Sequence, residues 1–335
     1  DTKRGQAEPM ASYILRRTLQ SIPILFGISV IVFAIVNLAP GDVTARFRVP
    51  RVPPEQIAAL IEAYGLNEPL IPRYFAWIST FVQVWRPEAW GYGFLNGQPV
   101  LNTFLERLPA TLRLTGAALV ITILFAIPIG VLAAVKQYSW TDKIITTMAT
   151  VGYAIPSFLL GLYILYFGGY VIKDLTDGAI GFPLFGSDRL GGNGNFVDIV
   201  WYLVLPVTSL AVQQIAAWAR YMRTSMLEVL HQDYVRTAKA KGLPRGRVLG
   251  KHALRNALIP VVTLLGLSVP GLIAGAAITE TIFSYPGLGS MFVDAVANRD
   301  YPVVQALTMV GGVAVILGNL LADVLYGVVD PRIKY

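Results

Sequence analysis

Few side chains in this 335-residue chain could carry catalytic or metal-binding chemistry. Cysteine is absent, which excludes disulfides and thiolate metal ligands. The two histidines, His231 and His252, lie in one basic segment without an HExxH pattern or a third ligand nearby. We therefore interpret both histidines as solvated or interface residues, and we predict neither a metal site nor a catalytic residue.

Polar side chains inside long apolar runs are the second group that could have a function. Exposing them to lipid is costly, so they line a pathway or form hydrogen bonds between helices. They are Asn37, Thr122, Ser157, Thr208, Gln213, Gln214, Thr263, Ser268, Thr279 and Asn319, with Glu280 and Asp323 at the flanks. We expect helix–helix hydrogen bonds for most of them. The candidate pathway residues are Glu280, Thr279, Gln213 and Ser268.

The elements that would position these residues are membrane-spanning helices. Hydrophobic residues make up 55% of the chain and charged residues 14%, and the mean hydropathy is +0.58. Such a composition does not suit a water-soluble surface. A helix needs roughly 20 apolar residues to cross the hydrocarbon of a bilayer. Six runs without Asp, Glu, Lys or Arg reach that length, namely Thr18–Gly41, Leu114–Val135, Ile144–Ile172, Ile199–Ala219, Asn256–Thr279 and Pro302–Ala322.

Proline occurs inside several of these runs. In a helix bundle, neighbouring helices or water can satisfy the carbonyl groups that proline leaves unpaired. The runs therefore predict either kinked but static helices or kinks that open a pathway. The prolines are Pro23, Pro128, Pro156, Pro206, Pro260 and Pro270.

The distribution of basic residues predicts the orientation. With a cytoplasmic amino terminus, the inside segments are residues 1–17, 136–143, 220–255 and 323–335, and they carry 17 of the 27 Lys and Arg residues. The outside segments are longer and less basic, as the positive-inside tendency requires. Both termini are therefore expected in the cytoplasm. The net charge of +7 needs no nucleic-acid partner, because this bias and the anionic inner leaflet account for it.

Five regions follow along the chain. Residues 1–9 precede Met10 and are interpreted as leader or vector residues, and residues 10–41 hold the amino terminus and a retained first span. Residues 42–113 are predicted to form an extracytoplasmic cap, with a short helix from Pro53 to Gly65. Spans two to six occupy residues 114–322, and residues 323–335 form the carboxyl terminus. A Gly-rich outside loop at 173–198 favours turns.

The inside segment 220–255 is the most informative. Gly242-Leu243-Pro244 interrupts it, which predicts one helix over about 222–241, a corner, and a second helix over about 245–257. Small side chains at Thr237, Ala238 and Ala240 stand among basic residues, so another surface could approach closely. The positive-inside bias, or an amphipathic helix lying at the membrane interface, would produce a similar pattern.

Several blocks of sequence, in order along residues 10–335, resemble inner-membrane permeases of dipeptide and oligopeptide ATP-binding-cassette importers. In the inside segment these blocks are Asp233-Tyr-Val-Arg-Thr-Ala-Lys-Ala-Lys-Gly242-Leu and His252-Ala-Leu-Arg-Asn-Ala-Leu-Ile-Pro260-Val-Val-Thr263. The others are Asn37-Leu-Ala-Pro-Gly-Asp42, Glu106-Arg-Leu-Pro-Ala-Thr111, Glu280-Thr-Ile-Phe-Ser-Tyr-Pro-Gly-Leu-Gly289, Arg299-Asp-Tyr-Pro-Val-Val-Gln305 and Asp330-Pro-Arg-Ile-Lys-Tyr335. The blocks Asn37–Asp42 and Asp330–Tyr335, together with the long first outside loop, resemble the first of that family's two permease types.

The resemblance implies an all-α membrane protein of the type I importer kind, in a bacterial or archaeal inner membrane. It implies a heterodimer with a second permease, two ATP-binding subunits that hold ATP and Mg, an extracytoplasmic substrate-binding protein and a peptide substrate. The chain has no Gly-x-x-x-x-Gly-Lys-Ser/Thr loop, so ATP has to bind to another subunit. Glu280 would meet a peptide ammonium near the outer end of the fifth span, or would pair with a basic loop residue.

The resemblance also implies a short helix that docks in a groove of an ATPase subunit. Gly242 would end it, and Ala238 and Ala240 would allow close packing. The docking residues are Asp233, Tyr234, Arg236, Thr237, Ala238, Lys239, Ala240, Lys241 and Gly242. The wider superfamily signature begins Glu-Ala-Ala, whereas Arg236-Thr237-Ala238 stand here, so a contact through that Glu is in doubt.

Other functions fit the sequence less well. A membrane-embedded enzyme would need a nucleophile with a base, or a ligand cluster at membrane depth, and both histidines lie outside the spans. An ion channel would need a filter loop or an Arg-repeat sensor. Within the resembling family, importers of nickel chelates, glutathione or sugars stay open as alternatives.

Overall fold

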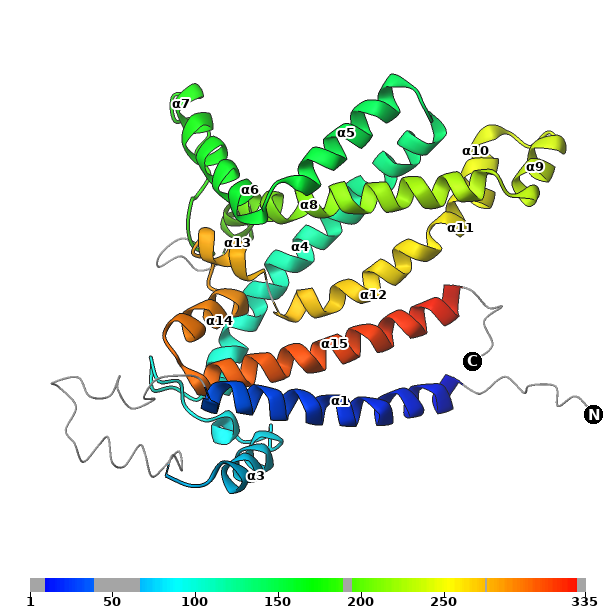
Figure 1. Cartoon of the computed structure of the whole chain (residues 1–335). Helices are drawn as coiled ribbons and strands as arrows, with labels where there is room; N and C mark the ends of the chain where they lie inside the picture. Colours follow the sequence, from blue (N-terminus) through cyan, green and yellow to red (C-terminus); the bar gives the residue numbers. More distant parts are fainter. Residues whose placement is uncertain (1–9, 39–66, 189–194, 275, 330–335) are drawn as a thin grey trace, which may run out of the picture. The chain divides into compact units, whose positions relative to one another are not determined.

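The computed structural model describes residues 10–38, 67–188, 195–274 and 276–329, and within them the chain is almost entirely helical (Figure 1). Its one β feature in these ranges is an isolated bridge between Tyr92 and Pro99. The predicted helix from Pro53 to Gly65 and residues 1–9 lie outside the described residues. The α-helices are α1 (Met10–Leu38), α3 (Leu70–Phe81), α4 (Val100–Val135), α5 (Trp140–Ala154), α6 (Ser157–Ile164), α7 (Ile172–Leu175), α8 (Phe196–Leu230), α9 (Asp233–Ala240), α10 (Arg245–Arg247), α11 (Arg255–Ala257), α12 (Ile259–Ala274), α13 (Ala277–Ile282), α14 (Leu288–Ala297) and α15 (Tyr301–Val329). A 3-10 turn, η2 (Pro87–Trp90), and two π-helical stretches, η3 (Leu165–Val171) and η4 (Val248–Leu254), complete the described elements.

Within the described residues, five helical segments are long and apolar enough to cross a membrane, and a sixth is reached if one bent pair counts as a span. The five are Ile14–Leu38, Val100–Val135, Ser157–Leu175, Phe196–Leu230 and Tyr301–Val324, and the bent pair is Arg245–Ala257 with Ile259–Ile273. This agrees with the predicted all-α membrane fold of six spans. The helices run further than the uncharged runs that predicted them: α4 begins at Val100, not Leu114, and therefore extends through part of the predicted cap.

The predicted third span is not one helix. α5 ends at Ala154, Ile155 has extended ψ of 126°, and α6 starts after Pro156. Proline has no N–H and disfavours the helical conformation in the residue before it, so the run from Ile144 to Ile172 breaks here. Gln213 of α8 donates from Nε2 to the carbonyl oxygen of Ile155 at 2.6 Å. A neighbouring helix therefore satisfies a carbonyl group at this break, as we expected for a proline inside a bundle.

The predicted fifth span is also interrupted. Helical axes on the two sides of Leu258 meet at 42°, and α12 is separated from α13 at Ala276, whose φ and ψ are −105° and 70°. The predicted run Asn256–Thr279 thus contains the end of α11, all of α12 and the start of α13. On α4, Thr115 donates from Oγ1 to the carbonyl oxygen of Leu272 at 3.1 Å, which satisfies one of the carbonyls in the last turn of α12.

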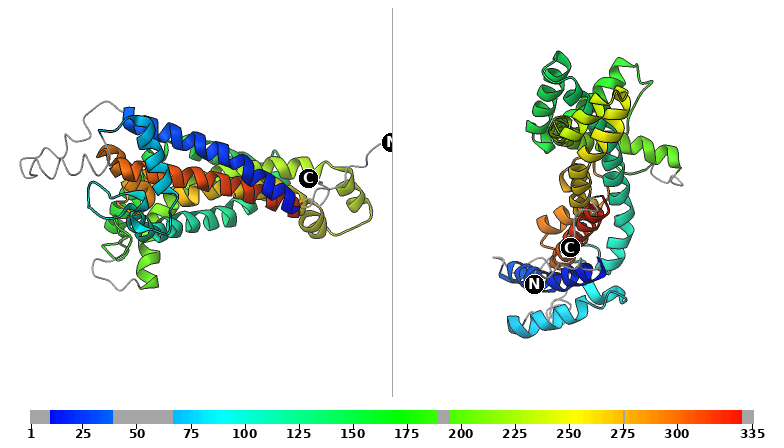
Figure 2. Two further views of the ribbon diagram at one scale, coloured as in Figure 1. Left: turned by 90° about the horizontal axis from the view of Figure 1, so that it is seen from below. Right: turned by 90° about the vertical axis from the view of Figure 1, so that its right-hand side faces the viewer.

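The chain divides into two compact units. The first contains Leu108–Ser290 and Ala314–Tyr335 together with the first residues of the chain. One of its cores joins α4, α8, η4, α11 and α12 (Figures 1 and 2). Gly130 of α4 permits the approach of α8, because a Cβ there would stand 2.6 Å from the carbonyl oxygen of Ala219.

The second unit contains Leu15–Arg107 and Met291–Val313. Aromatic rings fill its core: Tyr74 and Trp77 of α3 contact Phe33 of α1, and the ring series continues through Phe81, which stacks on Trp90 at 5.3 Å. Tyr74 and Ser29 share a hydrogen bond of 2.8 Å between their hydroxyl groups. The predicted cap therefore contains α3 packed directly against the first span.

Close packing of α12 in the first unit depends on Gly266 and Gly318 and not on Gly271. A Cβ at Gly271 would meet nothing within 4 Å, and residue 275 is outside the described ranges. By contrast, a Cβ at Gly266 would overlap the Cα and Cβ of Ala322 on α15, and a Cβ at Gly318 would stand 2.6 Å from the Pro270 ring. The α12–α15 contact therefore depends on Gly266 and Gly318.

Two glycines of α12, Gly266 and Gly271, provide a matched test. Replacing Gly266 with Ala should force α12 and α15 apart and lower the unfolding temperature of the purified chain, because overpacking costs about 1–3 kcal/mol. Gly271→Ala meets open space and should leave the unfolding temperature unchanged or slightly raised, since Ala favours helix over Gly. Equal effects of the two substitutions would contradict the packing described for Gly266.

Candidate functional site

The strongest candidate site is the corner at residues 231–244, which we call the elbow. It projects beyond the end of α8 (Figure 1). The single helix predicted over about 222–241 is wrong in one respect: α8 ends at Leu230, Gln232 is extended with φ −71° and ψ 148°, and α9 starts at Asp233. The break lets α9 fold back on its own chain and bury Val235. The second predicted helix, about 245–257, is present as α10, η4 and α11.

The short helix α9 has one buried and one exposed face. Val235 (0% exposed) and Ala238 (5%) pack against Val248 of η4. We expected Ala238 at a partner surface, but in this structure the chain itself covers it. The face open to a partner consists of Asp233, Tyr234, Arg236, Thr237, Lys239 and Ala240.

Gly242 ends α9 as the sequence predicts. Its φ is +72°, in the region that favours glycine. The N–H of Gly242 donates to the carbonyl of Lys239 at 3.0 Å, and the N–H of Leu243 to the carbonyl of Ala238 at 3.4 Å. This is the bond pattern of a Schellman motif, and Leu243 supplies its hydrophobic contact by packing on the Val235 cluster. The backbone of the elbow is thus fixed by hydrogen bonds and by burial together.

The elbow and the turn after it carry a strong positive charge. Residues 231–247 contain five Lys or Arg side chains and one acidic side chain, Asp233. Asp233 lies 3.6 Å from Arg236, but both groups are exposed, so the pair contributes little to stability. The surface is therefore suited to attract an acidic or dipolar partner surface.

The elbow is attached to the membrane helices through the second half of α8. Met222 and Met226 are fully buried in the core that contains Ala126 of α4 and Ala257 of α11. Ser225 adds a hydrogen bond of 2.9 Å to the carbonyl oxygen of Ala257. Packed side chains therefore connect the last turns of α8, which lead into the elbow, with α4, α11 and α12.

An ion pair that the sequence did not suggest fixes α8 to the start of α5. Arg223 donates from Nε and Nη2 to the two carboxylate oxygens of Asp142, at 2.6 and 2.8 Å. Tyr138 N–H and Thr146 Oγ1 also donate to this carboxylate, and Ser139 caps α5 by accepting from the N–H of Asp142. The hydrogen bonds from Arg223 are the main cause that lowers the pKa of Asp142 to about 2.

Glu280, the leading pathway candidate, lies buried at the first turn of α13 with 0% exposure. Its carboxylate accepts from Thr111 Oγ1 at 3.0 Å, from the N–H of Ser290 at 2.9 Å and from the N–H of Ala276 at 3.4 Å. Among the residues that the structure describes, no Lys or Arg forms the ion pair that we expected as the alternative. In this conformation the carboxylate holds α4, α13 and α14 together.

Two of the resembling blocks meet at this carboxylate. Thr111 closes the block that begins at Glu106, and its hydroxyl also accepts from the N–H of Leu288 at 2.7 Å. A Cβ at Gly287 would overlap the Glu280 carboxylate, and one at Gly289 would stand 3.0 Å from it. The glycines of the block from Glu280 to Gly289 therefore leave room for the buried acid.

Two of the other three candidate pathway residues have ordinary side-chain hydrogen bonds to backbone carbonyl groups. Thr279 is buried next to Glu280, and Ser268 donates to the carbonyl of Leu264 on its own helix at 2.8 Å. Gln213 binds the carbonyl of Ile155 at the α5–α6 break. The structure does not bring these four side chains together, so their role as pathway residues stays a prediction.

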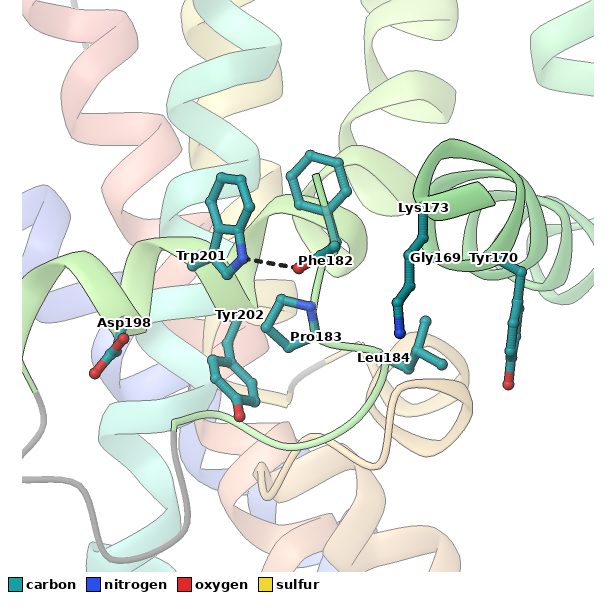
Figure 3. Close-up of a pocket in the computed structure, with 10 residues that line it drawn as sticks. Gly169, Tyr170, Lys173, Phe182, Pro183, Leu184, Asp198, Trp201 and Tyr202 are labelled. Atoms are coloured by element: carbon teal, nitrogen blue, oxygen red, sulfur yellow. Dashed lines mark hydrogen bonds between the residues drawn. The ribbon is translucent and has the colours of Figure 1, made fainter. Parts of the chain in front are cut away.

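At the opposite end of α8 from the elbow lies a pocket of about 330 Å³ that sequence reasoning missed (Figure 3). The end of η3, residues 181–184 and the first turns of α8 line it. Trp201 donates from Nε1 to the carbonyl of Gly181 at 3.1 Å, and its ring lies 4.6 Å from that of Phe182. Lys173 and Asp198 are its charged residues, and the pocket contains none of the candidate pathway residues.

Comparisons with known proteins agree with the resemblance. A family model described as "Binding-protein-dependent transport system inner membrane component" matches residues 126–335, and the model of the N-terminal part of such a membrane component matches residues 10–115. The chain is 43% identical over 327 residues to the oligopeptide transport system permease protein AppB of Bacillus subtilis, covering 97% of this chain and 100% of that one. It is 40% identical over 341 residues to the dipeptide transport system permease protein DppB of Escherichia coli K12, covering 97% and 99%. It is also 39% identical over 342 residues to the di/tripeptide transport system permease protein DppB of Pseudomonas aeruginosa, covering 97% of this chain and 99% of that one.

The Asp142–Arg223 pair predicts a specific loss of stability. Asp142→Asn leaves Arg223 without its carboxylate and should lower the unfolding temperature of the chain, because the Asp142 side chain is buried and that of Arg223 is only 24% exposed. Asp233→Asn is the matched control, because its pair is exposed, and it should leave the unfolding temperature unchanged.

The pH dependence has a definite sign. Because folding lowers the pKa of Asp142 to about 2, from about 3.9 in an unfolded chain, the ion pair is fully stabilising above about pH 5 and is lost as the pH falls toward 2. The parent chain should therefore unfold at a higher temperature than Asp142→Asn. The gap between the two unfolding temperatures should be the same at about pH 8 as at about pH 5.5, and it should become smaller toward about pH 3. A difference that grows with falling pH would refute the assignment.

Proposed function

Since the chain belongs to the family of binding-protein-dependent transport system inner membrane components, we propose that it is the first of two permease subunits of a peptide importer. It would form one half of a translocation pathway and would perform no covalent chemistry on the substrate. The observation that carries the proposal is the elbow: a basic, rigid corner outside the apolar segments, joined by buried packing to the spans.

The proposed substrate is a di- or oligopeptide. Support comes from relatives named as oligopeptide, dipeptide and di/tripeptide permeases, each of which aligns along nearly its full length. Selection among peptides would rest largely on an extracytoplasmic substrate-binding protein that delivers the ligand. Removing that protein should therefore abolish uptake without changing the fold of this chain.

The energy would come from two ATP-binding partner subunits, which would hold ATP and Mg. This chain contains no phosphate-binding loop, so a partner has to supply the nucleotide site. The exposed face of α9, with Tyr234, Arg236, Thr237 and Lys239, is the surface we assign to the ATPase. The elbow and both termini would then lie in the cytoplasm, in accordance with the density of basic residues in the sequence.

Movement would travel from the ATPase to the pathway in three steps. Closure of the two ATPase subunits displaces α9, and the Val235–Ala238–Val248 cluster passes the displacement to η4 and the end of α8. Met222 and Met226 then pass it to α4 and α12. The companion permease makes the equivalent movement, so that the pathway between the two alternates between inward-open and outward-open states.

Substitution of Gly242 tests this coupling. Gly242→Val puts a β-branched residue at φ +72°, which should unwind the end of α9 and reduce peptide uptake per ATP hydrolysed at least severalfold. Gly246→Ala is the control: Gly246 also has open space around it, but no positive φ, so coupling should be retained. Uptake and ATP hydrolysis are measured together in liposomes that contain the assembled transporter.

The amount of ATPase that purifies with each variant separates failed assembly from failed transmission. If Gly242→Val transports as efficiently per ATP as the parent, the elbow is not the coupling element. If the parent chain does not retain ATPase subunits in mild detergent, the importer assignment itself fails.

A further inference from the structure

The helix α3, in the region that the sequence predicts as an extracytoplasmic cap, packs against the apolar segment Ile14–Leu38 of α1. Its Tyr74 ring lies between Phe26 and Phe33 of α1, at centroid distances of 6.2 and 5.4 Å. The Tyr74 hydroxyl reaches Ser29, which at 1.5 Å per residue lies about 13 Å before the end of α1 at Leu38. We propose that α3 is a membrane-inserted helix whose exposed side contacts the acyl chains of the outer leaflet.

The side of α3 that faces away from α1 is apolar. Ile71, Phe75 and Val82 are 72%, 59% and 58% exposed. Their spacing of four and seven residues places them on one face of a helix. Such a stripe would be costly in water. In contact with acyl chains it would be stable, as the exposed Ile31 and Ile35 of α1 (59% and 65%) would also be.

The polar side chains at the end of α3 donate hydrogen bonds to backbone carbonyl groups of the same helix, as a low-dielectric environment requires. Ser79 donates to the carbonyl of Ala76 at 2.8 Å, and Thr80 to that of Trp77 at 2.9 Å. Gln83 returns its side chain to the carbonyl of Ser79 at 2.9 Å. At the other end, Pro69 and Pro72 have no N–H, so the first turn contains fewer donors that need a partner.

Arg73 is the one charged side chain of α3, and its placement is compatible with insertion. The guanidinium lies over the Phe33 ring, 5.7 Å from the centroid. Phe33 is one turn nearer to the outer end of α1 than Ser29, so the charge extends toward the headgroups while its stem stays beside the rings. Trp85, which is 75% exposed, follows α3, and an exposed Trp after a helix is typical of the membrane interface.

The absence of cysteine from the chain makes the test direct, because each introduced thiol is unique within it. Phe75→Cys and Val82→Cys variants of the full chain are spin-labelled and reconstituted in phosphatidylcholine–phosphatidylglycerol liposomes. Collision rates of the label with oxygen, which concentrates in lipid, and with a water-soluble nickel chelate are then measured. Ile31→Cys on α1 is the lipid-facing control, and Glu88→Cys in η2 is the aqueous control.

Membrane insertion predicts that labels at 75 and 82 collide more often with oxygen than with nickel, as at 31, and that the order reverses at 88. Frequent nickel collisions at both 75 and 82 would show an aqueous cap and overturn the proposal. Low rates with both reagents would also overturn it, because they would show a protein covering this face. Unfolding temperatures equal to that of the parent chain confirm that the labelled variants are folded.

Discussion

The packing of Met222 and Met226 is the constraint on which the rest of the structure depends. These side chains lie on the part of α8 beyond its apolar section, and they bind that part to α4, η4 and α11. Without this core, the elbow would stand at the end of a helix that nothing fixes to the rest of the bundle. With it, α9 is an extension of the membrane bundle, and a displacement at its surface becomes a displacement of helices.

Polar groups inside the bundle and charged groups on its surface have different surroundings. Inside the bundle, polar groups are held by partners on other helices: Glu280 by Thr111 and by backbone N–H groups, and the Ile155 carbonyl by Gln213. The partly buried pair of Asp142 and Arg223 fixes α5 to α8. Exposed basic side chains gather instead on the elbow, where a partner surface could meet them.

The sequence predicted the features that local chemistry decides. Long uncharged runs identified the spans, and the Gly242-Leu243-Pro244 interruption identified the corner. The conformation of Gly242 followed from the need for an αL residue at the end of a helix. The features that depend on distant contacts were not predictable. Nothing local indicates that Ala238 packs inward, that Gly266 rather than Gly271 faces another helix, or that Thr111 meets Glu280 across 169 positions. The break before Asp233 was missed because it is stabilised by burial of Val235 on η4.

Photo-cross-linking from the exposed face of α9 tests the central claim most directly. A benzophenone maleimide is attached to Thr237→Cys, on that face, in the assembled transporter, with Phe196→Cys at the opposite end of α8 as the reference. The account predicts that light joins the label at 237 to an ATP-binding subunit and that the label at 196 does not react with it. Cross-linking of 237 to lipid alone, or of 196 to the ATPase, would contradict the account.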